Sequence, residues 1–400
     1  MADIKESTVE VHPVSFPTDI LARISPDLSL QRHLSLGFRP SSRGFEEFRD
    51  VIINTGDLTH NTQSDDSAVK TPSNDGKQVL GSCVLKQGDV FVITQITGGI
   101  IEDITLSTND MEMEEDTELL EITEEHSDIT KYSSVYPVVE INRGRMGACT
   151  DEEMTTSQRL YDSLLHSHIL TQNALRVEPG VRITNEDDSV NIIYPDSEKN
   201  KEITSLLKPK KKWSYVLYAK IEVFGRTGPV YDMCWNSLMA ALQSVKLPRT
   251  FIDERATDLK MTVRARGRNA VVMETYNLLC DPNESTNLQL RENCISYASS
   301  YGAINLDPEA DIANLEETDD VDAPMDEELE TKTVLLADID GEAEETCIKS
   351  TISITACPNG RFKQFSVVGG GAKITKELLM RSITLSKQRS SDISLKVQKV

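Results

Sequence analysis

The sequence is poor in aromatic residues and has no long apolar stretch. Of its 400 residues, 38% are hydrophobic but only 5% are Phe, Trp or Tyr, so we expect a core built of Leu, Ile, Val and Ala. No apolar run approaches the ~18 residues that a membrane helix needs. The opening residues, MADIKESTVEVHP, lack the cationic start and apolar stretch of a secretory signal. These absences predict a soluble, intracellular chain that does not associate with membranes.

Patterns that hold metals, disulfides or cofactors are also missing. The seven cysteines are odd in number and none forms a C-x-x-C pair, which favours reduced thiols. His166 and His168 are two residues apart, so they point to different sides of a helix. No G-x-S-x-G, P-loop or G-x-G-x-x-G motif occurs. The GGG at 369–371 is typical of a tight turn, with anion binding as the alternative. We therefore expect no metal and no cofactor.

Two segments contain no Lys or Arg. Residues 102–128 and 307–330 each hold 12 acids, and they account for the net charge of −23. Outside them, 41 acids face 42 bases, so the remaining body is close to neutral. Self-repelling acidic blocks are typical of solvated loops. The alternative is that they dock a basic partner.

Hydrophobic periodicity predicts an α+β fold. Residues 1–37 indicate an N-terminal helical arm, and residues 38–400 a single domain in two similar β-α-β halves. The first half spans 38–175, a linker spans 176–212, and the second half spans 213–400, with the acidic segments as insertions. Strand, turn, strand and glycine cluster follow one another both in GSCVLKQGDVFVITQITGG and in STISITACPNGRFKQFSVVGGG. This similarity of layout suggests two copies of one unit.

The stretch GPVYDMCWNSLMAALQSVKLP, 228–248, resembles the start of a phosphate-binding or acid–base site. We read GPVYDM as a strand and NSLMAALQSVKLP as an amphipathic helix, with Leu238, Ala241 and Leu242 on one face. Asp232 then stands before the helix, and Asn236 serves as its cap or lies in its first turn. On this interpretation no glycine stands between the acid and the helix, and no cation stands at the helix mouth.

Several segments resemble the ribonuclease PH family. They are FRPSSRGFEEFRDVIINTG, LGSCVLKQGDVFVITQITGGI, YPVVEINRGRMGACTDEE, the central Asp–helix stretch and the terminal DIDGEAEETCIKSTISI. Arg39, Pro40, Arg43 and Arg49 carry the arginine-rich opening of that family. The match extends over nearly the whole chain and is strongest to the eukaryotic ring subunits of the RNA exosome. It implies the ribonuclease PH-like (ribosomal protein S5 domain 2-like) fold.

The resemblance also implies where an active site would lie. Active relatives carry a glycine-rich loop with an arginine before the central helix, and a pair of acids six residues apart later in the chain. Carried onto this sequence, the first element falls at Asp232 and Asn236, and the second at Glu344 and Ser350. Asn236 cannot neutralise a phosphate, and Ser350 cannot bind a divalent cation as a carboxylate would. These four residues are thus interpreted as a degenerate former site, with no catalytic residue.

Basic clusters are the candidates for contact with RNA. Arg143 and Arg145 follow a predicted strand, and Arg264, Arg266 and Arg268 alternate along another. The lysines of KPKKKW, 208–213, are interpreted as the end of a flexible loop. Such charges attract phosphates without sequence preference. The alternative role is ordinary surface solvation or salt bridges within an assembly.

The resemblance implies a non-catalytic structural subunit of the RNA exosome core ring. Expected partners are other ribonuclease PH-like subunits in a hetero-hexameric ring, S1/KH-type cap subunits, the processive hydrolytic exoribonuclease, and single-stranded RNA in the channel. The expected location is cytoplasm, nucleus and nucleolus. The alternatives are an active phosphate-dependent 3′–5′ exoribonuclease and a stand-alone acidic interaction protein that shares only the fold.

Overall fold

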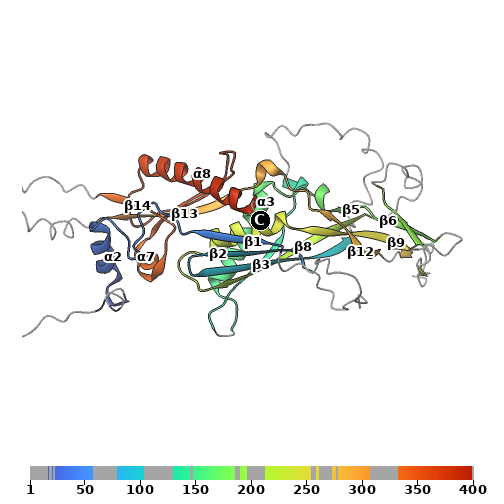
Figure 1. Cartoon of the computed structure of the whole chain (residues 1–400), viewed down its shortest axis with the longest axis horizontal. Coiled ribbons are helices and arrows are strands. Elements are labelled where there is room, and N and C mark those ends of the chain that lie inside the picture. The colour runs from blue at the N-terminus through green and yellow to red at the C-terminus, as the bar shows by residue number, and fades with distance from the viewer. Residues whose placement is uncertain are drawn as a thin grey trace, which may run out of the picture.

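The computed structural model describes residues 17, 20, 23–56, 79–102, 129–144, 147–184, 190–195, 212–253, 258–260, 273–275, 278–306 and 332–398. Both acidic segments, apart from Glu102, lie outside these residues. The described body is elongated, with two β-sheets along its length and a strand-rich extension at one end (Figure 1). No described helix is long and apolar enough to span a membrane.

The first sheet has its strands in the order β1-β2-β3-β8-β4, and β5 pairs with the start of β8. Buried residues alternate with more accessible ones along the first part of β3 and along β8, as expected for a sheet covered on one face. All neighbours are antiparallel except β4 and β8, which are parallel. The strands are β1 (Val51–Thr55), β2 (Val79–Gln87), β3 (Val90–Glu102), β4 (Tyr136–Ile141), β5 (Arg176–Val177) and β8 (Trp213–Phe224).

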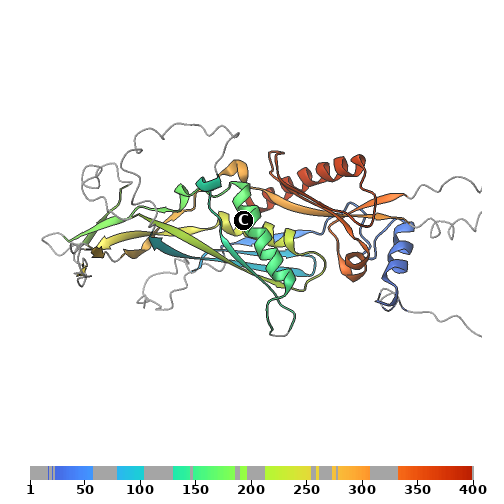
Figure 2. The ribbon, with the colours of Figure 1, turned by 180° about the vertical axis from the view of Figure 1, so that it is seen from behind.

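Two helices lie on the covered side of this sheet, as Figure 2 shows for α3 (Asp151–Ser167). A capping box at Thr150 and Glu153 fixes the start of α3. The second helix, α5 (Tyr231–Gln243), packs on β2 and β3 with one side and on β13 with another. Because sheets cover it from both sides, nearly all of its residues are buried.

The second sheet has the order β14-β13-β15-β16, and all its pairings are antiparallel. The long helix α8 packs on β13 and β15, and α7 packs against α2 from the start of the chain. Leu30 and Leu34 of α2 join Leu336 and Ile348 in a small apolar cluster. The elements are α2 (Pro26–Ser35), β13 (Tyr297–Asn305), β14 (Thr333–Ala337), α7 (Gly341–Cys347), β15 (Ser350–Ala356), β16 (Phe362–Val368) and α8 (Lys376–Gln398).

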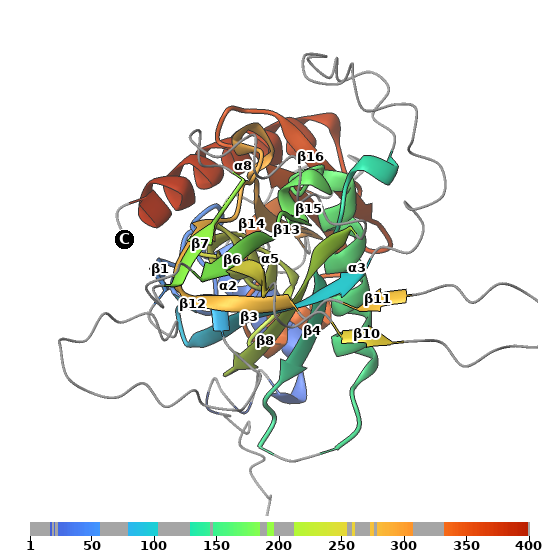
Figure 3. The same cartoon turned by 90° about the vertical axis from the view of Figure 1, so that its right-hand side faces the viewer.

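The extension is a four-stranded sheet in the order β12-β9-β6-β7, accompanied by the short hairpin β10-β11 (Figure 3). Strand β9 follows α5 directly, so the extension begins where α5 ends. Its strands are β6 (Gly180–Thr184), β7 (Val190–Ile193), β9 (Lys246–Asp253), β10 (Asp258–Lys260), β11 (Met273–Thr275) and β12 (Leu278–Asn287), and single 3₁₀ turns are η3 (Ile129–Lys131), η4 (Asn173–Leu175) and η7 (Glu292–Cys294).

The α+β prediction is confirmed, and two sheets each carry helices. The strand–turn–strand layouts form the hairpins β2-β3 and β15-β16. Strand β8, which we predicted as the start of the second half, lies between β3 and β4 in the first sheet. One local prediction is wrong: GPVYDM forms no strand, and α5 begins at Tyr231 rather than at Asn236. Because α5 is buried on both sides, its first turn lacks the single apolar face by which we predict a helix.

Candidate functional site

The earlier start of α5 changes what precedes it. The loop before the helix is residues 225–230, and it contains Gly225 and Gly228, both with positive φ, and Arg226. A Cβ on Gly228 would lie 2.4 Å from the backbone oxygen of Ile339, so the loop packs directly against the segment after β14. The interpretation that Asp232 stands before the helix and that no cation stands at the helix mouth is therefore wrong, because Asp232 is the second residue of α5 and Arg226 lies in the loop before it. The signal was present in FGRTGP, whose two glycines and proline mark a turn before a helix.

Arg226 is, however, fully engaged by carboxylates. Its Nε donates to Oε1 of Glu152 at 2.9 Å, and its Nη1 donates to Oε2 of Glu345 at 3.1 Å. Burial acts to lower the pKa of Arg226, but these two acids outweigh it and the pKa is raised. Arg143 donates from Nη2 to the other oxygen of Glu152 at 3.0 Å. A cavity of about 670 Å³ is lined by Arg143, Arg226 and Glu152 together, so both its cations are charge-balanced.

A buried arginine from the start of the chain holds Glu344. Arg39 and Glu344 are fully buried, and Arg39 donates from Nε to Oε1 of Glu344 at 2.8 Å and from Nη2 to Oε2. Arg39 also donates to the backbone oxygens of Ala337 and Asp338. Glu344 in turn accepts the backbone N–H of Asp340 at 2.9 Å. Glu344, which we assigned to the former site, therefore neutralises Arg39 and fixes the loop at Asp340.

Asp338 is the second acid of this cluster and is held by Arg49. Nε and Nη2 of Arg49 each lie 2.8 Å from an oxygen of Asp338, and the backbone N–H of Arg49 donates to it at 3.0 Å. Gln87 and Arg43 donate to the same carboxylate. Burial acts to raise the pKa of Asp338, but the hydrogen bonds and charge of Arg49 outweigh it, and the pKa is lowered. Arg49 also reaches Asp340 at 3.1 Å.

We call Arg39, Arg43, Arg49, Asp338, Asp340 and Glu344 the arginine–acid cluster. The sequence drew attention to its arginines only as a family motif, and to only one of its acids. The arginines and the acids are about 290 to 305 positions apart in the sequence, so no local spacing connects them. Only the meeting of the loop before β1 with the segment that runs from the end of β14 into α7 brings them together.

Asp232 and Asn236 lie on α5 and face β13. Burial raises the pKa of Asp232 to about 6, while a hydrogen bond with Ser300 and the charge of Arg159 partly offset it. Asn236 is buried, donates from Nδ2 to the backbone oxygen of Ala298 at 3.1 Å, and accepts the N–H of Ala298 at 2.8 Å. It lies beyond the first turn, so our expectation of a cap or first-turn residue is wrong.

Ser350 is the first residue of β15 and fixes the glycine turn. Its buried Oγ accepts the backbone N–H groups of Gly371 at 3.0 Å and Ala372 at 2.9 Å. The four former-site positions are thus used in different ways: Asp232 and Asn236 bond to β13, Glu344 bonds to Arg39, and Ser350 bonds to the turn before α8. Among the described residues, no group of three His, Cys, Asp or Glu side chains could hold a metal ion.

Of the predicted RNA-binding residues, the structure describes only Arg143, which is exposed and paired with Glu152. Arg145, Arg264, Arg266 and Arg268 lie outside the described residues, as do Lys208, Lys210 and Lys211.

Comparisons with known proteins identify relatives over much of the chain. A profile of the 3′ exoribonuclease family, domain 1, matches residues 47–248. The exosome complex component rrp43 of Schizosaccharomyces pombe is 23% identical over 244 residues, which are 61% of this chain and 66% of that protein, slightly under two thirds of its length.

Two solved structures match most of the chain. One is described as an archaeal exosome core (TM-score 0.48, 14% identity, 96% of this chain and 100% of that chain). The other is described as an Archaeoglobus fulgidus exosome with RNA bound to the active site (TM-score 0.48, 15% identity, 94% of this chain and 99% of that chain).

Proposed function

We propose that this chain, which belongs to the 3′ exoribonuclease family, is a non-catalytic subunit of an RNA exosome core ring. Its work in this proposal is structural: it helps to form the channel that guides single-stranded RNA to 3′–5′ processing and degradation. Its similarity to the S. pombe exosome component supports the exosome as the assembly.

The observation that carries the proposal is that charges near the loop before α5 are already paired. A phosphorolytic site needs a cation that can receive phosphate and an acid that can move a proton or hold a metal. Here Arg226 is held by Glu152 and Glu345, and Glu344 is held by Arg39. Freeing either partner would leave a buried or half-buried charge uncompensated, which is costly.

The proposed partners are other ribonuclease PH-like subunits in a hetero-hexameric ring, S1/KH-type cap subunits and the processive hydrolytic exoribonuclease. RNA would pass through the channel, and Arg143 with Arg145, Arg264, Arg266 and Arg268 would attract its phosphates without sequence preference. The proposed location is cytoplasm, nucleus and nucleolus. The proposed domain organisation is a helical arm over 1–37 and one domain over 38–400.

The test of catalysis uses the chain purified alone and within its ring. A 5′-labelled single-stranded RNA is incubated with and without inorganic phosphate, next to an active ribonuclease PH as the positive control. We expect no phosphate-dependent shortening by the isolated chain. Release of nucleoside diphosphates by it would refute the non-catalytic role.

The test of assembly is native mass spectrometry of the complex purified through this chain. We expect masses that correspond to a ring of six different ribonuclease PH-like subunits, with and without cap proteins. A monomer that brings down no such subunit would refute the ring and favour a stand-alone interaction protein.

One observation favours the alternative of an active phosphate-dependent exoribonuclease. Asp232 is a carboxyl in the first turn of α5 whose pKa is raised to about 6, which suits a group that exchanges protons near neutrality. If the isolated chain does degrade RNA with phosphate, Asp232→Asn should abolish the activity. Glu46→Gln, an exposed acid-to-amide change, is the matched control and should not.

A further inference from the structure

The second sheet ends at β14, and this edge strand lies in a slot between two helices. Figure 1 shows β14 between α8 and α2 at one end of the molecule. A cavity of about 620 Å³ lies along the strand, and residues 332–335 line it. On the side of α2 its lining includes Leu34 and Phe45, and on the side of α8 it includes Leu378 and Arg381.

Hydrogen bonds at both ends of β14 show which of its main-chain groups face the slot. Asp338 donates its N–H to β13, and the carbonyl of Lys332 accepts an N–H from the residue that follows β13. Alternate residues of an antiparallel pair bond to the same neighbour, so the even-numbered residues of β14 bond to β13. Thr333, Leu335 and Ala337 therefore turn their N–H and C=O groups away from β13.

Only part of this outward row is paired. The N–H of Ala337 donates to the backbone oxygen of Phe45 at 2.8 Å, so another stretch of main chain already lies along one end of the edge. Within the part of the chain that the structure describes, the N–H groups of Thr333 and Leu335 meet no acceptor. Leu335 is only 5% exposed, so water has little access to it. A buried N–H without a partner is rare in folded proteins, and a strand edge of this kind is a template for a further strand.

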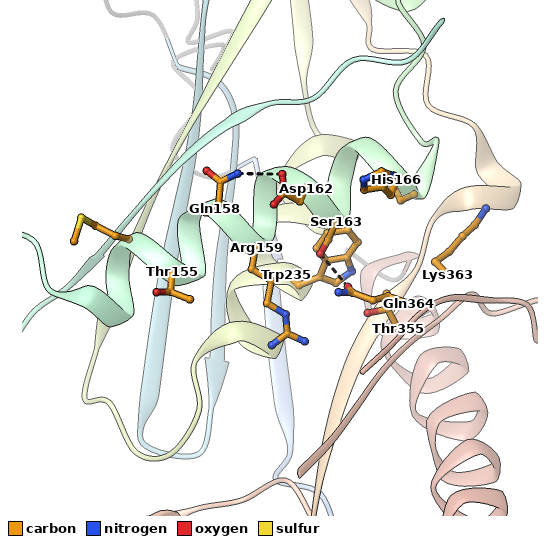
Figure 4. Close-up of a pocket in the computed structure, with 12 residues that line it drawn as sticks. Thr155, Gln158, Arg159, Asp162, Ser163, His166, Trp235, Thr355, Lys363 and Gln364 are labelled. Atoms are coloured by element: carbon orange, nitrogen blue, oxygen red, sulfur yellow. Dashed lines mark hydrogen bonds between the residues drawn. The ribbon is translucent and has the colours of Figure 1, made fainter. Parts of the chain in front are cut away.

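Comparable groups elsewhere in the protein are covered. At β4, which ends the first sheet, the N–H groups of Val139 and Ile141 donate to side chains of α3. A larger cavity, of about 690 Å³, lies between α3 and β16, and there Ser163 donates to Gln364 and joins the two walls (Figure 4). The slot beside β14 differs from both because its unpaired groups belong to the main chain, which an extended peptide would match.

The chain contains a stretch that fits the slot, ahead of its described residues. Residues 8–12, TVEVH, alternate in polarity, are rich in residues that favour strands, and are followed by Pro13, which cannot donate to a ladder. In a strand, Val9 and Val11 share one side and Glu10 takes the other. This pattern matches a slot that presents a leucine and a phenylalanine on one side and an arginine on the other.

The chain is also long enough to place this stretch beside β14. Helix α2 begins at Pro26, and its 10 residues extend over about 15 Å. His12 and Pro26 are 14 positions apart in the sequence, which can span up to about 46 Å when extended. The stretch can therefore run back along α2 to its end, where Leu34 lines the slot.

We propose that residues 8–12 add to β14 as a further strand of the second sheet, and that their main chain bonds to Thr333 and Leu335. In this arrangement the two valines face α2 and the glutamate faces α8. The added strand covers an edge that would otherwise be open to association with other chains. This inference goes beyond the proposed ring function and does not rest on it.

The test is hydrogen exchange of the full-length protein, read at the amides of Thr333 and Leu335. We expect both amides to exchange slowly in the unaltered protein. The double variant Val9→Asp, Val11→Asp places charges against the apolar side of the slot. It should speed the exchange of both amides by roughly tenfold or more, because a main-chain hydrogen bond and its apolar cover are lost. Val14→Asp makes the same change outside the stretch and should leave both rates unchanged.

A second arm supplies the stretch as a separate molecule. A synthetic peptide of residues 7–13, STVEVHP, should restore slow exchange to the double variant in a saturable way, and the same peptide with both valines replaced by aspartate should not. Fast exchange in the unaltered protein, equal rates in the double variant, an equal effect of Val14→Asp, or a peptide without effect would each overturn the proposal. Slow exchange that appears only when ring partners are bound would assign the edge to another chain and would also overturn it. None of these outcomes affects the ring proposal.

Discussion

Replacing Arg39 with methionine is the sharpest test of the arginine–acid cluster. The side chains of Arg39 and Glu344 are 0% and 2% exposed, so the change would leave a carboxylate in the interior with one remaining hydrogen bond, from Asp340. The backbone oxygens of Ala337 and Asp338 would each lose a donor as well. Breaking a buried pair from one side costs about 3–5 kcal/mol, and we expect Arg39→Met to lower the free energy of unfolding by that amount.

The assay is urea unfolding at neutral pH, run as a double-mutant cycle. Glu344→Gln keeps the shape and one acceptor and should cost about 1–3 kcal/mol. The double variant should cost less than the sum of the single variants by at least about 1 kcal/mol, because the two side chains form one unit. Arg381 and Glu46 provide the control: they form a two-pronged pair at 55% and 39% exposure, and Arg381→Gln should leave the free energy of unfolding nearly unchanged.

Two results would refute this reasoning. If Arg39→Met cost no more than Arg381→Gln, the burial of the pair would have no energetic consequence. If the single variants were additive, Glu344 would not depend on Arg39, and the acid would be available for chemistry after all.

Three further predictions follow from local features. Because the pKa of Asp232 is raised from 3.8 to about 6 in the folded state, the free energy of unfolding falls as pH rises between those values. In thermal unfolding, Asp232→Asn should be neutral at pH 4 but stabilising by up to about 3 kcal/mol at pH 7.5. A difference that does not depend on pH would contradict this. Thr150→Ala removes the side-chain cap of α3 and should cost about 1 kcal/mol in urea unfolding, whereas no loss would mean that the cap is redundant. Gly228→Ala should lower the free energy of unfolding by about 3 kcal/mol or more, because the new Cβ would meet the backbone oxygen of Ile339. Gly37 also has a positive φ but faces open space, so Gly37→Ala should cost only about 1–2 kcal/mol. Equal costs for the two variants would exclude the close contact.

Local patterns predicted much of the fold because they act over short distances. The β2-β3 hairpin follows from strand-like runs on either side of a glycine turn. The start of α5 was missed for a physical reason. Val230, Tyr231 and Trp235 favour strands by propensity, and the helix is buried on several sides, so no polar face marks its first turn.

The site could be predicted only in part. The sequence indicated Asp232, Glu344 and Ser350 as positions of interest, but it could not show what each one contacts. Arg39 and Glu344 are 305 positions apart and meet because the loop before β1 lies against α7.

The arginine–acid cluster connects the two sheets as well as neutralising charge. Asp338 follows β14 of the second sheet, yet it accepts hydrogen bonds from Arg49, next to β1, and from Gln87, at the end of β2. Arg49 also donates to Thr227 in the loop before α5. A carboxylate that served catalysis would have to change partners during each cycle, and every such change would loosen this junction between the sheets. In the ring that we propose, the subunit would hold its shape best in the opposite arrangement, in which the acids keep their arginines throughout.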